Sequence, residues 1–227
     1  MVLFRTIKNR LVLILLLCSF LPLLLLRFMA FPKAQMDLEE ALIRNLEGVK
    51  QKQAEIVKMW FDERRHDAKV VSRNISGLME RSVNDKLRGY PKLYDCIDMV
   101  RTEYGYKMVY IVSCDGTVLV ATQRQLIGSN MLSYDYCREG LNGTICISKI
   151  QCLDQGEGES KKSDSDGPMM YISAPLIDSD NRTIGAVVLK VNTLPLSEIM
   201  KSAKLGKTGE TVLINREGFM LTESRCA

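Results

Sequence analysis

The stretch Gly206-Lys207-Thr208 has the residue types that close a phosphate-binding loop, G-x-x-x-x-G-K-[ST]. In that motif, backbone N–H groups and the lysine hold the phosphates, and a helix follows. The first glycine of the motif falls on Lys201 in this chain, and the residues after Thr208 predict a strand. The sequence therefore excludes a phosphate loop at this place.

Two other polar segments contain residues that occur in metal or catalytic sites. Residues 164–167 resemble part of a calcium loop, but the first ligand position falls on Lys162 and the closing glutamate position on Ser173. His66, the only histidine, has no nucleophile or ligand set beside it. We therefore expect no enzymatic activity, no metal and no cofactor in this chain.

The sequence does not determine whether the seven cysteines form disulfides or are free thiols. Cys18 lies within an apolar run, and the six that follow it allow fifteen disulfide pairings. No two of them have the C-x-x-C spacing of zinc or thioredoxin-type sites. Cys137, Cys146 and Cys152 are close enough in sequence for a local bridge, and free buried thiols are an equally good interpretation.

The N-terminal segment has the composition of a membrane anchor. Cations occur among the first ten residues, an apolar run without charges covers residues 11–26, and no acid precedes Asp37. Continued to residue 31, the run has about 20 residues, enough for a hydrocarbon core of ~30 Å. The cations place residues 1–10 in the cytoplasm and the rest outside. A cleavable signal peptide is the alternative, although the run is long for one and no small-x-small site follows it.

Residues 35–88 predict one long helix, because the segment lacks proline and its apolar residues recur at helical spacing. These residues are Leu38, Leu42, Leu46, Val49, Val57, Trp60, Val71, Ile75 and Leu78. A helix of roughly 50 residues is about 75 Å long. Gly89-Tyr90-Pro91 is predicted to end the helical stretch.

Beyond residue 91 the apolar pattern becomes that of strands. Four strands are predicted in two hairpins, 108–113 with 117–122 and 169–177 with 182–191. A short helix (134–141), a strand (145–151) and a polar loop (153–168) are predicted between the hairpins. The fold class is therefore α+β, an antiparallel sheet of about five strands with helices on one side.

The end of the chain repeats the first hairpin. Residues 212–221 match residues 110–119, because both have two apolar runs around an acidic residue and a glycine. A lone hairpin is marginally stable at best. We therefore expect residues 201–227 to be the incomplete start of a second copy of the domain, in a truncated chain.

Three stretches have a distinctive sequence: residues 54–64 (AEIVKMWFDER), residues 173–178 with 184–189 (SAPLID and IGAVVL) and residues 206–215 (GKTGETVLIN). They resemble the double-Cache sensor domains of bacterial histidine kinases, chemoreceptors and related transmembrane receptors. The resemblance covers residues 36–225. It implies a membrane-distal, PAS-like module at residues 89–200 that binds a small molecule. It also implies that the long helix forms a homodimer and carries motion through the membrane.

In amino-acid-sensing members of that family, an arginine and aromatic residues at the short helix hold the carboxylate of the ligand. The arginine position is Tyr134 here, Cys137 replaces the second aromatic, and Tyr136 keeps the expected character. Arg138, one turn later, is interpreted as a surface residue. The resemblance therefore does not extend to amino-acid recognition. Candidate ligand-binding residues are polar or aromatic side chains of the inner strands and short helix: Tyr110, Tyr134, Tyr136, Tyr171 and Ser173.

Together these features predict the extracytoplasmic small-molecule-sensing part of a bacterial signal-transduction receptor. Its full form is expected to be a sensor histidine kinase of a two-component system or a chemoreceptor, in the inner (plasma) membrane with the C-terminal part in the periplasm. The alternative is a membrane-anchored structural or dimerisation protein that senses nothing. The expected partners are a small-molecule ligand, the lipid bilayer and a second copy, whereas a net charge of +4 without a basic stripe excludes nucleic acid.

Overall fold

The computed structural model describes residues 7–83, 89–150, 168–203, 209–216, 218 and 220–222. The chain divides into two compact units, Met1–Lys52 and Gln53–Ala227. The predicted polar loop at residues 153–168 lies outside the described residues except at its last position.

The described part of the first unit is the N-terminal portion of helix α1 (Ile7–Val83). The described residues contain one helix that is long and apolar enough to cross a membrane, by length and composition only; an 18-residue window near its N-terminus has a mean hydropathy of 2.7. The apolar side chains near its start are exposed in the structure. The sequence predicted residues 11–31 and 35–88 as separate elements. One helix, α1, includes the first segment and the second as far as Val83, and residues 84–88 lie outside the described part.

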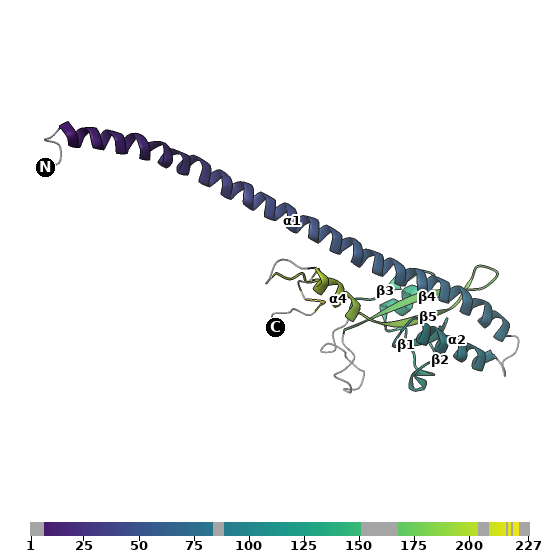
Figure 1. The fold of residues 1–227 in the computed structure, drawn as a ribbon. Helices are drawn as coiled ribbons and strands as arrows, with labels where there is room; N and C mark the ends of the chain where they lie inside the picture. Colours follow the sequence, from purple (N-terminus) through teal and green to yellow (C-terminus); the bar gives the residue numbers. More distant parts are fainter. Residues whose placement is uncertain are drawn as a thin grey trace. The chain divides into compact units, whose positions relative to one another are not determined.

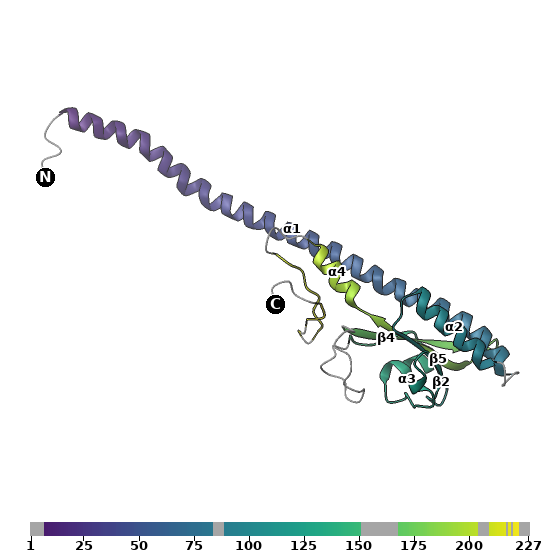
Figure 2. The same cartoon turned by 60° about the horizontal axis from the view of Figure 1, so that its bottom comes forward.

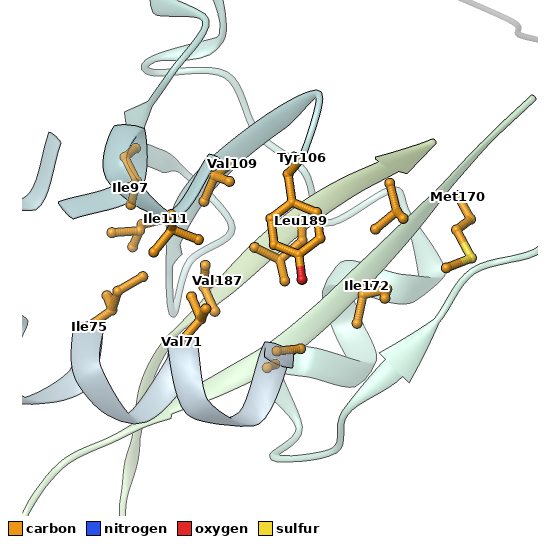
Figure 3. Close-up of a cluster of buried hydrophobic side chains, with 14 of the residues drawn as sticks. Val71, Ile75, Ile97, Tyr106, Val109, Ile111, Met170, Ile172, Val187 and Leu189 are labelled. Atoms are coloured by element: carbon orange, nitrogen blue, oxygen red, sulfur yellow. The ribbon is translucent and has the colours of Figure 1, made fainter. Parts of the chain in front are cut away.

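In the second unit, α1 packs one side against the domain. Its buried apolar residues are Val57, Trp60, Ala68, Val71, Ile75 and Met79. Steps of three, four or their multiples place these side chains on one helical face. The predicted apolar spacing is thus confirmed for this part of the helix. In Figure 3, Val71 and Ile75 point from α1 toward the sheet.

Helix α2 (Gly89–Glu103) was not predicted. The sequence interpretation of Gly89-Tyr90-Pro91 as the end of the helical stretch is wrong, because these residues begin a new helix. Proline is tolerated in the first turn of a helix, where its missing N–H has no intrahelical partner to lose. Leu93, Ile97 and Val100 of α2 are buried in the same core as Ile75.

The sheet has five strands in the order β2-β1-β5-β4-β3, and all of its pairings are antiparallel. The strands are β1 (Met108–Ser113), β2 (Val118–Ala121), β3 (Cys146–Ile147), β4 (Met169–Ile177) and β5 (Thr183–Asn192). Both predicted hairpins are confirmed. The strand predicted at 145–151 is shorter, because only two of its described residues pair with β4.

Helices cover both faces of this sheet, which corrects the prediction of helices on one side only (Figures 1 and 2). Val109 and Ile111 of β1 face the core with α1 and α2, whereas Met108, Tyr110 and Val112 belong to a second core. Helix α3 (Asp135–Leu141) closes that second core. Successive side chains of a strand point to opposite faces, and β1 is apolar on both. We call the side with α3 the α3 face.

Helix α4 (Leu194–Ser202) follows β5 and was not predicted either. After it, Ile214 and Met220 form an antiparallel bridge. Residues 214 and 220 lie 102 positions after Val112 and Val118, which pair with each other in the first hairpin. Gly116 and Gly218, separated by the same interval, both have positive φ, 84° and 87°. The predicted repeat therefore holds at the level of this local pairing, while the second domain copy stays a prediction.

Candidate functional site

Four tyrosines gather on the α3 face and form what we call the tyrosine cluster: Tyr110 (β1), Tyr134 and Tyr136 (at α3) and Tyr171 (β4). The rings of Tyr136 and Tyr171 stack with centroids 4.8 Å apart and an interplanar angle of 2°. The rings of Tyr134 and Tyr136 lie 5.4 Å apart at 26°. The structure thus brings together all four tyrosines that the sequence proposed as ligand-binding residues.

The cluster offers neutral hydroxyl groups in a dry environment. The hydroxyls of Tyr110 and Tyr136 share a hydrogen bond of 3.3 Å. Burial holds the pKa of both phenols well above the usual range, so both stay protonated at physiological pH. A neutral phenol can donate one hydrogen bond and accept others.

The fifth candidate, Ser173, lies on β4 next to the cluster. Across the sheet it pairs with Val188 of β5, which pairs with Tyr110 of β1. Ser173 is fully buried, and its Oγ has no hydrogen-bond partner among the described residues. An unpaired buried hydroxyl costs about 1–3 kcal/mol. A ligand that hydrogen-bonds this hydroxyl would recover that cost.

Helix α3 comes very close to the sheet at Ser173. A Cβ placed on Gly140 would overlap Ser173 Oγ and would lie 3.3 Å from the Cβ of Ala186. Only glycine therefore allows α3 to pack at this distance from β4. Helix α3 ends at Leu141, where the predicted helix 134–141 ends, and Gly143 after it has a φ of 91°.

Lys190 of β5 was not among the predicted site residues. It pairs with Tyr171 on one side and Met108 on the other, so its side chain is on the α3 face. Its Nζ lies 5.8 Å from the centroid of the Tyr171 ring, a cation–π contact. Lys190 is a single charged residue within an otherwise apolar run, and this feature of the sequence could have identified it.

Two cysteines border the site as free thiols. Cys137 of α3 is fully buried, and burial raises its pKa from 9.0 to about 11. Burial, with Glu139 and Asp135 nearby, also raises the pKa of Cys146. Of the two states left open by the sequence, the structure has free thiols at both positions, and Cys152 lies outside the described residues. Neutral thiols of this kind are poor nucleophiles.

Arg138 does not reach the cluster. It forms an ion pair with Asp135, one turn earlier on α3, and both side chains are exposed. The interpretation of Arg138 as a surface residue is confirmed. Within the described ranges there is also no group of three or more His, Cys, Asp and Glu side chains that could hold a metal. The arrangement supports noncovalent binding through aromatic faces and hydroxyl groups.

An open groove of about 580 Å³ lies elsewhere on the domain, between α1 and the β4–β5 hairpin. Its lining includes Lys69, Ser72, Arg73 and Ser76 of α1 and Asp178 after β4. None of the four tyrosines lines it. Because no buried polar side chain without a partner, among the residues described, points into this groove, we place the candidate site at the tyrosine cluster instead.

No protein-family model and no curated protein sequence matches this chain. Its fold does match solved structures of receptor sensor domains. The sensory domain of the Campylobacter jejuni chemoreceptor Tlp3 matches with a TM-score of 0.67 and 13% identity, covering 84% of this chain and 75% of that one. The ligand-binding domain of the Pseudomonas aeruginosa PAO1 chemoreceptor PctC matches with a TM-score of 0.62 and 12% identity, over 79% and 74% of the two chains.

The sensor domain of the histidine kinase DctB from V. cholerae matches with a TM-score of 0.55 and 15% identity. That match covers 74% of this chain and 61% of the other. At such low identity the matches establish the fold. The chain therefore has the α+β fold of the sensor domains of chemoreceptors and of a histidine kinase, and the fold that the resemblance to double-Cache domains implied is confirmed.

Proposed function

We propose that this chain is the extracytoplasmic small-molecule-sensing module of a bacterial signal-transduction receptor. Its ligand binds on the α3 face, at Tyr110, Tyr134, Tyr136, Tyr171 and Ser173. The observation that carries the proposal is the buried Ser173 hydroxyl, which has no partner among the described residues and lies beside stacked tyrosines. Stability alone would favour alanine at such a position.

The fold comparisons support the same role. The Tlp3 sensory domain has been solved with isoleucine bound, and the PctC domain in complex with GABA. The tyrosine cluster has the mixture of aromatic surface and few polar groups that is typical of small-molecule sites.

The full receptor is a sensor histidine kinase or a chemoreceptor in this proposal. Residues 11–31 anchor it in the inner membrane, residues 89–200 form the membrane-distal module in the periplasm, and residues 201–227 begin the membrane-proximal one. The apolar, exposed start of α1 supports the anchor. The long helix forms the homodimer, and exposed Leu38, Leu42 and Leu46 at helical spacing support that role.

Those exposed leucines also favour the alternative, a membrane-anchored dimerisation protein without a ligand. Thermal unfolding of the full chain in detergent micelles separates the two functions. A ligand that binds the folded state increases the free energy of unfolding, by about 2.7 kcal/mol at 100 times the Kd, and thereby raises the melting temperature. The compounds to test are small carboxylates, amino acids, amines, sugars and purines, each at millimolar concentration.

We expect at least one class of compound to raise the melting temperature, and Ser173→Ala to remove that rise. Ser133→Ala, an exposed serine near the start of α3, is the matched control and should keep it. If no compound of any class stabilises the chain, or if Ser173→Ala and Tyr136→Phe both keep the full rise, the α3 face is not a sensing site.

A further inference from the structure

The charges of the sheet are distributed very unevenly. The five strands contain no aspartate or glutamate, and Lys190 is their only charged residue. The acids nearest to the site in the sequence are Asp135 and Glu139 of α3, and both are exposed at the surface. Asp135 is paired with Arg138. The described part of the site therefore contains a cation and no carboxylate.

Lys190 has no acidic partner among the described residues, and its ammonium lies against the face of Tyr171. Its side chain is half-buried, so part of the hydration of the charge is lost on folding. A cation–π contact replaces only part of that hydration, because it contributes about 0.5–2 kcal/mol. The ammonium remains available for an anion at the edge of the tyrosine cluster.

The position of Lys190 relative to Ser173 sets the size of such a ligand. Lys190 pairs with Tyr171, and Ser173 is two residues further along β4 on the same face. Diagonal neighbours of this kind have their Cβ atoms about 7–8 Å apart. A molecule of a few carbon atoms that contacts the ammonium with one end therefore has the length to reach the Ser173 hydroxyl with the other. Because that hydroxyl lies against Gly140, binding there requires α3 to shift from the sheet. The body of the molecule would lie among apolar and aromatic side chains.

An amino group on the ligand has no place in this arrangement. A buried ammonium requires a carboxylate or several hydrogen-bond acceptors to offset its lost hydration. The described site offers neutral phenols, one serine hydroxyl and a like charge at Lys190. A zwitterionic amino acid would thus gain binding free energy at its carboxylate and lose binding free energy at its amino group.

We infer that the ligand of this site is a small organic anion without an amino group, whose carboxylate binds Lys190 and whose polar end binds Ser173. The inference rests on the proposed sensing function and narrows the chemistry of its ligand. It separates this chain from those solved structural neighbours that hold isoleucine, valine or GABA.

The test compares matched probes on the full chain in detergent micelles. Each three- to six-carbon carboxylate with a second polar group, such as lactate, 3-hydroxybutyrate or 4-hydroxybutyrate, is paired with the amino acid and the primary amine of the same carbon skeleton. Melting temperature and isothermal titration calorimetry report binding, with sodium sulfate as the inorganic anion. The variants are Lys190→Met, Lys190→Arg and, as control, Lys69→Met, an exposed lysine of α1 outside the tyrosine cluster.

We expect carboxylates to bind better than their amino-acid and amine partners. Lys190→Met should lower carboxylate affinity about 10-fold or more, since a hydrogen bond to a charged group contributes about 1.5–3 kcal/mol. Lys190→Arg and Lys69→Met should retain binding. The inference is overturned if amino acids or amines bind better, if sulfate binds equally well, or if Lys190→Met has no effect. Binding of amino acids that depends on Ser173 would leave the sensing function standing, whereas failure of every probe class would remove both proposals.

Discussion

The hydroxyl of Ser76 on α1 accepts a hydrogen bond of 2.9 Å from the backbone N–H of Ile177, at the end of β4. One helical turn earlier, the hydroxyl of Ser72 donates to the carbonyl oxygen of Pro175. Strand β3 ends its pairing with β4 at Ser173, so no described strand covers this outer edge. The two serines therefore occupy an edge that would otherwise expose unpaired backbone groups.

Replacing Ser76 with alanine should destabilise the domain. The variant leaves the N–H of Ile177 without its partner, and Ser76 is only 7% exposed. We expect a loss of about 1–3 kcal/mol in the free energy of unfolding, measured by chemical denaturation of the full chain in micelles. Ser133→Ala, at an exposed position, should change it by no more than about 0.5 kcal/mol. Equal effects of the two variants would contradict the role of Ser76.

A second prediction follows from the contact between Gly140 and Ser173. Gly140→Ala should destabilise the domain by about 1–3 kcal/mol through overpacking, because the new Cβ would overlap Ser173 Oγ. Ser173→Ala in the same chain should restore part of the loss, which a double-mutant cycle would measure as a coupling energy.

The matched control for Gly140 is Gly77, a helical glycine of α1 with nothing within 4 Å of its added Cβ. Gly77→Ala should stabilise the chain by up to about 1 kcal/mol, because alanine is the better helix former. If Gly140→Ala leaves stability unchanged or raises it as Gly77→Ala does, α3 does not approach β4 as closely as described.

Ser173→Ala alone should separate stability from binding. The substitution removes a buried hydroxyl without a partner among the described residues, so the free energy of unfolding should stay the same or rise. The affinity for the best carboxylate probe should fall by about 10-fold. Denaturation and calorimetry on the same preparation give both numbers. A variant that loses stability and keeps its affinity would show that Ser173 is a structural residue.

Alkaline pH should destabilise the domain through Cys137. Its pKa is raised by burial from 9.0 to about 11, so the unfolded chain releases the proton first as the pH rises. Stability is therefore full below pH 9 and is lost progressively between pH 9 and 11. Tyr110 and Tyr136, whose pKa values burial also raises, act in the same direction. Denaturation across this range should give a shallower decline for Cys137→Ala; an unchanged slope would show that Cys137 does not contribute.

The strands were predictable because their signals are local. Residues 108–113 are a run of mostly β-branched and aromatic residues, residues 169–177 are a mostly apolar run, and Asp115-Gly116 supplies the turn of the first hairpin. Helix α2 was missed because Gly89-Tyr90-Pro91 has the same composition whether a helix ends or begins there. The position of α3 on the opposite face had no local signal either, because β1 is apolar on both sides.

The site was predictable in part. The four tyrosines and Ser173 were proposed from residue type and from their place on inner strands and a short helix. The structure brings them together on the α3 face, and their role in ligand binding stays a prediction. Lys190 was missed because its significance depends on register: only the pairing with Tyr171 places it on the α3 face. The contact of Gly140 with Ser173 joins residues whose proximity arises from packing of α3 on the sheet, which no local pattern records.

Hydrogen–deuterium exchange of the full chain tests the central claim most directly, with and without the carboxylate that gives the largest rise in melting temperature. The account predicts slower exchange in α3 (Asp135–Leu141) and β4 (Met169–Ile177) when the ligand is present. Protection confined to the groove between α1 and the β4–β5 hairpin, with α3 unchanged, would contradict it.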